Sequence, residues 1–167
     1  MKKRIFSILL TFLLMFTLTP SAFAARDIEF VHKNKTEIVY LNNGSYITIT
    51  LIAKDISTLS LTSTDSATFT KAGNKVVTCR DKKGNLEWEY TLFAEFSVVE
   101  NVSATCTSAT YSQTIYASDW SFSNGNATKA GNTAYGVGTF KRKVLFVTVD
   151  TANIDISISC DVNGNLS

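Results

Sequence analysis

The sequence predicts an all-β fold, a single-domain antiparallel β-sandwich of immunoglobulin-like architecture, and three observations carry that prediction. Residues 86–98 alternate apolar and polar side chains, the period of a strand with one face on a core and the other in water. Short strand-like runs separated by turn residues recur along the chain. Thr, Val, Ile, Tyr and Phe, which suit pleated surfaces, are frequent.

The first 24 residues have the pattern of a secretory signal peptide. Basic residues 2–4 precede an apolar run over residues 5–18, and Ala22 and Ala24 are the small residues of a cleavage site. The run is shorter than the roughly 20 residues that a membrane-spanning helix needs. We expect cleavage after Ala24, secretion to the extracellular space and a single mature domain over residues 25–167.

Cleavage changes the charge of the chain. The sequence has 16 Lys and Arg against 14 Asp and Glu, and the loss of residues 2–4 leaves 13 basic residues, a net charge of −1. Without a positive field, neither nucleic acid nor, after cleavage, a membrane is an expected partner. Two basic runs, at residues 80–83 and 141–143, lie between predicted strands and are expected to be solvated hairpin ends.

Residues 86–98 are expected to form an interior strand, with other strands paired beside it. The strongest hairpin signal is Asn43-Gly44, because both residues tolerate positive φ. The pentapeptide Thr-Lys-Ala-Gly-Asn occurs at residues 70–74 and again at 128–132, and is expected to be one turn used twice. The other predicted strands are residues 36–41, 46–52, 56–62, 67–71, 75–80, 103–109, 111–117, 120–123, 133–140, 144–149 and 154–160.

A pattern of residues runs through the mature chain: Trp88, Tyr90, Leu92, Ala94 and Phe96 at period two, then Cys106, Trp120, Ala130-Gly131-Asn132-x-Ala134 and the terminal Cys160-x-x-Asn163-Gly164-x-Leu166-Ser167. This pattern resembles a family of small secreted proteins from Gram-positive bacteria, especially clostridial gut species. The resemblance implies export, one β-rich domain and a shared pair of cysteines, and it implies no particular activity. Cys79 is an addition to the family's pattern.

The cysteines are expected to include one disulfide. Cys160 continues the alternation of Ile154, Ile156 and Ile158, and Cys106 continues that of Val102 and Ala104, so both sulfurs should face the core. In an oxidising compartment this predicts a Cys106–Cys160 bridge that closes a loop of about 55 residues. Cys79 is then expected to be a buried, poorly reactive thiol, with intermolecular pairing as the alternative.

Residues that support catalysis or metal binding are sparse, and no cofactor is expected. His32 is the only histidine, so a Ser or Cys nucleophile lacks its usual base, and no zinc spacing is present. Residues 161–165 alternate oxygen-bearing side chains, but the glycine is misplaced for an EF-hand, so a terminal turn is expected rather than a calcium site. Glu87, Glu89 and Glu95 share one strand face, which fits either a solvated sheet or a glycosidase pair.

These observations favour a secreted non-enzymatic β-sandwich that acts as a binding or surface-interaction module for an extracellular ligand, such as a cell-wall glycan or a protein. The candidate ligand-binding residues are Trp120, Phe122 and Tyr116, because exposed rings stack on sugars. The alternative for Trp120 and Phe122 is a place in the core. The alternative function is a secreted hydrolase or toxin-like effector that uses the face of Glu87, Glu89 and Glu95.

Overall fold

The computed structural model describes residues 35–41, 44–60 and 67–167, with backbone only for 55–60. The predicted signal peptide, His32, Asn43 of the predicted hairpin turn and the end of the predicted strand 56–62 lie outside these residues. None of the described residues is helical.

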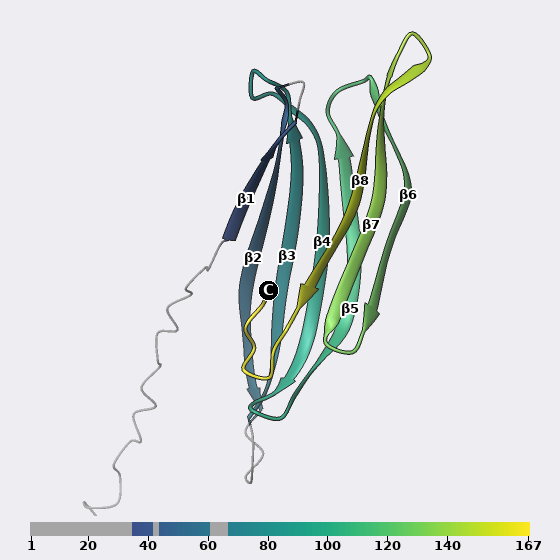
Figure 1. The fold of residues 1–167 in the computed structure, drawn as a ribbon. Coiled ribbons are helices and arrows are strands. Elements are labelled where there is room, and N and C mark those ends of the chain that lie inside the picture. Colours follow the sequence, from purple (N-terminus) through teal and green to yellow (C-terminus); the bar gives the residue numbers. More distant parts are fainter. Residues whose placement is uncertain (1–34, 42–43, 61–66) are drawn as a thin grey trace, which may run out of the picture.

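The described residues form two antiparallel sheets (Figure 1). The five-stranded sheet has the order β1-β2-β3-β4-β5 and the three-stranded sheet the order β6-β7-β8. The strands are β1 (Lys35–Tyr40), β2 (Tyr46–Ser60), β3 (Thr68–Arg80), β4 (Leu86–Val99), β5 (Ser103–Ile115), β6 (Trp120–Ala130), β7 (Thr133–Val144) and β8 (Val147–Ser159). This confirms an all-β antiparallel sandwich. The immunoglobulin-like part of the prediction is not confirmed, because each sheet follows chain order, whereas immunoglobulin domains use Greek-key connections.

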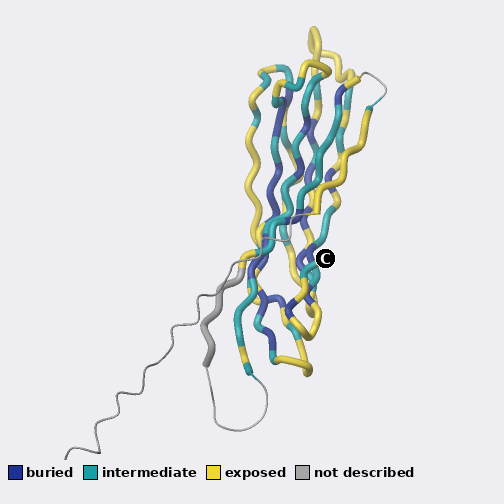
Figure 2. The backbone as a smooth tube through the Cα atoms, turned by 90° about the vertical axis from the view of Figure 1, so that its left-hand side faces the viewer, coloured by how far each residue is buried: buried dark blue, intermediate teal, exposed yellow. Residues whose placement is uncertain are grey.

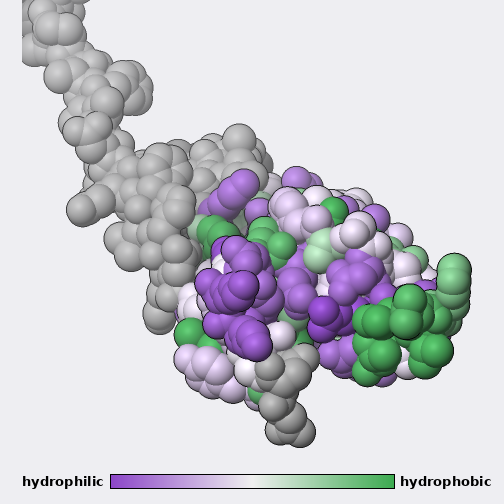
Figure 3. All heavy atoms as spheres, turned by 90° about the horizontal axis from the view of Figure 1, so that it is seen from above, coloured by the Kyte–Doolittle hydropathy of each residue, from purple (hydrophilic) through white to green (hydrophobic). Residues whose placement is uncertain are grey.

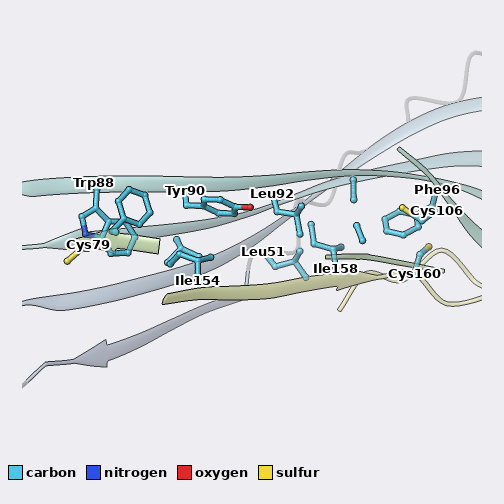
Figure 4. Close-up of a cluster of buried hydrophobic side chains, with 14 of the residues drawn as sticks. Leu51, Cys79, Trp88, Tyr90, Leu92, Phe96, Cys106, Ile154, Ile158 and Cys160 are labelled. Carbon is cyan, nitrogen blue, oxygen red and sulfur yellow. The ribbon is translucent and has the colours of Figure 1, made fainter. Parts of the chain in front are cut away.

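The core lies between the sheets, and β4 supplies its largest part (Figures 2 and 4). β4 is an interior strand between β3 and β5, and its alternate residues from Trp88 to Val98 are at most 2% exposed. Trp88 stacks on Phe140 of β7, with ring centroids 4.0 Å apart and planes inclined by 10°. The Tyr90 hydroxyl donates to the carbonyl oxygens of Asn126 and Val137, both at 3.3 Å. The predicted register of β4 is therefore confirmed.

The strands are longer and fewer than the sequence suggests. β3 spans the two predicted strands 67–71 and 75–80, β5 spans most of 103–109 and 111–117, and β2 continues from 46–52 into the predicted strand 56–62. Polar and small residues inside these strands form backbone hydrogen bonds with a neighbouring strand, and these bonds continue the strand. A short stretch of sequence does not reveal such pairing.

The repeated pentapeptide does not form the same structure twice. Its second copy ends in the predicted turn, with Gly131 at a φ of 55°, between β6 and β7. The first copy is a continuous part of β3, so the turn predicted there is wrong. Gly73 is needed at that point because a Cβ would collide with the Leu166 side chain, which packs across the strand. Tertiary packing, rather than a turn, explains this glycine.

Candidate functional site

The aromatic residues predicted to bind a glycan are mostly buried. Trp120 is 7% exposed, and its ring meets that of Trp88 edge-on with centroids 5.9 Å apart. Phe122 is half-buried and packs against Phe140, with ring centroids 4.8 Å apart. Only Tyr116, 55% exposed, points to water. Trp120 and Phe122 therefore pack in the core, the alternative expected for them, and the sugar-stacking surface is corrected, because a single exposed tyrosine makes no platform.

The three glutamates of β4 do not converge. Cys79 pairs with Trp88 but Arg80 pairs with Leu86, so Glu87 is the extra residue of a β-bulge. The bulge turns Glu87 inward, where it is 7% exposed and its carboxylate accepts a hydrogen bond from Cys79 Sγ at 3.4 Å. Glu89 is half-buried and Glu95 is exposed farther along the strand. The common face of three carboxylates on which the hydrolase alternative depended is therefore absent from β4.

All three cysteines are free and buried, so the structure contains no Cys106–Cys160 disulfide and corrects that prediction. Both sulfurs do face the core, as predicted (Figure 4), but Cys106 Sγ donates to Ser108 O at 3.3 Å and Cys160 Sγ to Asp161 O at 3.5 Å. Burial raises the pKa of Cys160 to about 11 and also raises that of Cys106. The raised pKa values favour the neutral thiols of these core residues over the thiolate.

Cys79 is buried, as predicted. Its side chain is 1% exposed, and burial, together with the hydrogen bond to Glu87, raises the pKa of its thiol to about 12. A thiol with this pKa has almost no thiolate at neutral pH.

Residues 161–165 form a turn, as the sequence predicts. Asp161 Oδ1 accepts the backbone N–H groups of Asn163 and Asn165, both at 2.8 Å, and Oδ2 accepts Asn165 Nδ2 at 2.8 Å. The β3–β4 turn repeats the arrangement, with Asp81 accepting from Lys83 and Asn85. In both turns hydrogen bonds from asparagine lower the pKa of the aspartate. The carboxylate lone pairs that a cation would use are thus engaged by the chain itself.

The β7–β8 hairpin ends in an exposed apolar turn that the sequence analysis missed. Val144 pairs with Val147, and Leu145 and Phe146 form the two-residue loop between them. Leu145 is 87% exposed and Phe146 100% exposed. We call residues 144–147 the apolar tip; it belongs to the green area at the edge of the view in Figure 3.

The backbone of the apolar tip is unfavourable for its residues. Leu145 has a φ of 49° and Phe146 a φ of 69°, the pair of positive values that marks a type I′ turn. This turn favours Asn-Gly, because both residues tolerate the left-handed region. Leucine and phenylalanine do not, and each such residue in this conformation destabilises the folded state by about 1–2 kcal/mol. Exposed runs of apolar residues and strained backbone are both typical of binding sites.

The base of this hairpin is fixed to the sandwich by Asp119. The Asp119 carboxylate accepts a hydrogen bond from Arg142 Nε at 2.6 Å, and its backbone carbonyl accepts one from Lys143 N at 2.8 Å. This carboxylate also raises the pKa of Arg142, which therefore stays charged. Because two bonds from one residue hold the end of β7, the apolar tip projects from a well-defined base.

Four exposed lysines lie at the same end of the sandwich as the apolar tip. Lys141 and Lys143 are exposed and form no ion pair with any residue that the structure describes. The β3–β4 turn lies at the same end of the sandwich (Figure 1) and adds the exposed Lys82 and Lys83. Both lysines of that turn line a polar hollow of about 300 Å³ together with Arg142, so residues of the two basic runs meet there, beside the carboxylates of Asp81 and Glu87. We call Lys82, Lys83, Lys141 and Lys143 the basic collar.

A second concavity, of about 480 Å³, lies between β2 and the C-terminal residues. Its floor is apolar, and its three lysines all interact with other groups of the chain. Lys35 pairs with Glu37 at 3.1 Å, and Lys75 Nζ donates to the carbonyl oxygen of Ser157. Burial lowers the pKa of Lys75, consistent with an amine that is turned inward. This groove therefore presents less free charge than its composition suggests.

Two further searches cover the described residues alone. No group of three or more His, Cys, Asp or Glu side chains that could hold a metal ion is found among them. Nor does this part of the chain contain a helix long and apolar enough to cross a membrane.

Comparisons with family models, curated proteins and solved structures find no match to this chain. The resemblance to secreted clostridial proteins therefore stays a prediction, and the candidate site is argued from its geometry. The site that the structure brings together is the end of the sandwich with the apolar tip and the basic collar. One sequence signal pointed to it: the four consecutive apolar residues 144–147 break the period of two and lack a turn residue.

Proposed function

We propose that this protein is a secreted, non-enzymatic β-sandwich that binds a partner at a cell surface through the apolar tip of the β7–β8 hairpin. The observation that carries the proposal is the conformation of Leu145 and Phe146, which are exposed to water and held at positive φ. Both features lower the stability of the free protein. A bound partner removes the exposure to water, because it covers the two side chains.

The surroundings of the tip support a binding surface rather than a catalytic one. Asp119 fixes the base of the hairpin, so the tip is presented with little conformational freedom to lose on binding. The carboxylates of Asp119 and Glu87 at this end are engaged with Arg142 and Cys79 respectively, and that of Asp150 on β8 accepts the backbone N–H of Thr151. The lysines of the basic collar add a charge preference to an otherwise apolar contact.

The test uses the mature protein, residues 25–167, with intact Gram-positive cells. The double variant Leu145→Asn/Phe146→Gly replaces the tip by the residues that a type I′ turn prefers and removes both apolar side chains. Wild-type protein should be retained on the cells, and the variant should be lost from them. The matched controls are Tyr135→Asn on the same strand and Val102→Asn at the opposite end, both exposed apolar positions. Equal retention of wild type and the double variant, or no retention of either, overturns the proposal.

A further inference from the structure

We infer that the partner of the apolar tip is an anionic lipid bilayer, into whose interface Leu145 and Phe146 insert. This inference rests on the proposed function and names its partner. The apolar tip and the basic collar lie in the order that a membrane surface requires, with the apolar residues outermost and the lysines behind them. Apolar side chains then enter the acyl boundary while the ammonium groups stay at the level of the headgroups.

Charge complementarity selects an anionic surface. Lys141 and Lys143 precede the tip on β7, four and two residues before Leu145, and no described acidic group forms an ion pair with them. Lys82 and Lys83 belong to the β3–β4 turn, which lies at the same end of the sandwich as the tip (Figure 1). Each cation near an anionic leaflet strengthens binding about fivefold. Lipid attraction decays within about a Debye length, so the charges near the tip matter more than the net charge of −1. Asp81 and Asp150 also lie at this end, but the four lysines of the basic collar outnumber them.

The size of the tip predicts weak and reversible binding that needs both parts of the site. Two inserted side chains bury far less apolar area than a spanning helix, so the lysines supply the second signal that interfacial anchoring requires. Neutral bilayers should therefore be bound poorly, and salt should release the protein from anionic ones. A protein partner that covers the tip has no reason to discriminate between lipid compositions.

The experiment measures cosedimentation with vesicles of phosphatidylcholine and phosphatidylserine, and with vesicles of phosphatidylcholine alone. Wild type should bind the mixed vesicles, and Leu145→Asn/Phe146→Gly should bind them at least about a hundredfold less, since each side chain contributes about tenfold or more. Lys141→Gln/Lys143→Gln should lose about 25-fold on the mixed vesicles. Tyr135→Asn and Lys54→Gln, both exposed and outside the site, should match wild type.

Insertion is read separately with the variant Phe146→Trp. Both native tryptophans are buried, Trp88 at 0% and Trp120 at 7% exposure, so a new indole at position 146 dominates any change in quenching. On mixed vesicles its emission should shift to the blue and its quenching by iodide should fall. An unchanged spectrum with vesicle binding intact overturns insertion.

The outcomes separate this inference from the proposed function. Tip-dependent retention on cells without binding to mixed vesicles overturns the lipid assignment and leaves the proposed binding surface standing. Failure of both assays overturns both. Vesicle binding that survives in Leu145→Asn/Phe146→Gly, or a wild-type dimer in sedimentation that this variant abolishes, also overturns the lipid assignment, the latter in favour of a second copy as the occupant.

Discussion

Leu145 and Phe146 lower the stability of the folded state in two ways: their backbone has positive φ, and their apolar side chains are exposed to water. Asn101 and Asn124 also have positive φ, at 59° and 56°, but asparagine tolerates this conformation. Among the described residues other than glycine, asparagine therefore fills this conformation elsewhere, and less suitable residue types fill it at the tip. This contrast indicates that the tip is retained for a reason other than stability.

The double variant Leu145→Asn/Phe146→Gly should stabilise the protein. Removal of two left-handed residues that carry bulky side chains should raise the free energy of unfolding by about 1–3 kcal/mol, measured by urea denaturation. Leu145→Asn alone should give part of the gain, and Asn124→Gly should change stability by only a few tenths of a kcal/mol. A fall in stability would show that the hairpin does not hold a type I′ turn in solution.

The thiols predict an unusual dependence of stability on pH. Burial raises the pKa of Cys79 from an ordinary 9.0 to about 12 and that of Cys160 to about 11. Above pH 9 the unfolded chain releases thiol protons that the folded chain keeps, so the unfolded state binds fewer protons and stability falls as pH rises. The midpoint of urea unfolding should therefore decrease between pH 9 and pH 11.

Two controls belong to this prediction. Cys79→Ser keeps a donor for Glu87 but does not titrate in this range, so its alkaline loss should be smaller. Thiol reagent should modify native protein slowly and should modify all three cysteines after unfolding. A count of one thiol in the unfolded protein would restore the Cys106–Cys160 disulfide that this structure lacks.

At the scale of the element, β4 shows what a periodic sequence pattern predicts about burial and what it does not. The alternation from Trp88 to Val98 is reproduced residue by residue in the core. Glu87 departs from it, because the bulge opposite Cys79 and Arg80 turns its side chain inward. A bulge depends on the partner strand, so the sequence of β4 alone does not reveal it.

Truncation on the two faces of β4 should have unequal effects. Trp88→Ala removes a fully buried ring that stacks on Phe140 and should destabilise the protein by about 3–5 kcal/mol. Glu89→Ala, on the opposite face, should change stability by less than about 0.5 kcal/mol. Comparable losses for both in thermal or chemical denaturation would contradict the register of this strand.

At the scale of the whole molecule, the C-terminal residues close the sandwich. The backbones of Cys160 and Leu166 form an isolated antiparallel β-bridge, and the Leu166 side chain lies over Gly73 of β3. Ser167 and Ser159 exchange backbone hydrogen bonds at 3.0 Å. The C-terminal segment therefore lies against the five-stranded sheet as part of the packed structure.

Gly73→Ala should destabilise the protein by about 1–3 kcal/mol, because its new Cβ collides with Leu166. Leu166→Ala should also destabilise it, through lost packing. If the collision is the cause, the double variant Gly73→Ala/Leu166→Ala should be more stable than the sum of the single losses predicts. Additive losses in this double-mutant cycle would mean that Gly73 is required for a different reason.

The sequence determined which class of fold this chain adopts and which face of β4 is buried, because alternation of apolar residues is a local property that directly reflects one-sided burial. It also determined that residues 161–165 form a turn. Only the tertiary structure decided the lengths of the strands, the inward turn of Glu87, the burial of Trp120 and the meeting of residues 80–83 with 141–143 at one end. These features depend on which strands lie side by side. A strand-like run such as residues 144–149 becomes an exposed turn only when β7 and β8 pair, and that pairing creates the apolar tip on which the proposed function depends.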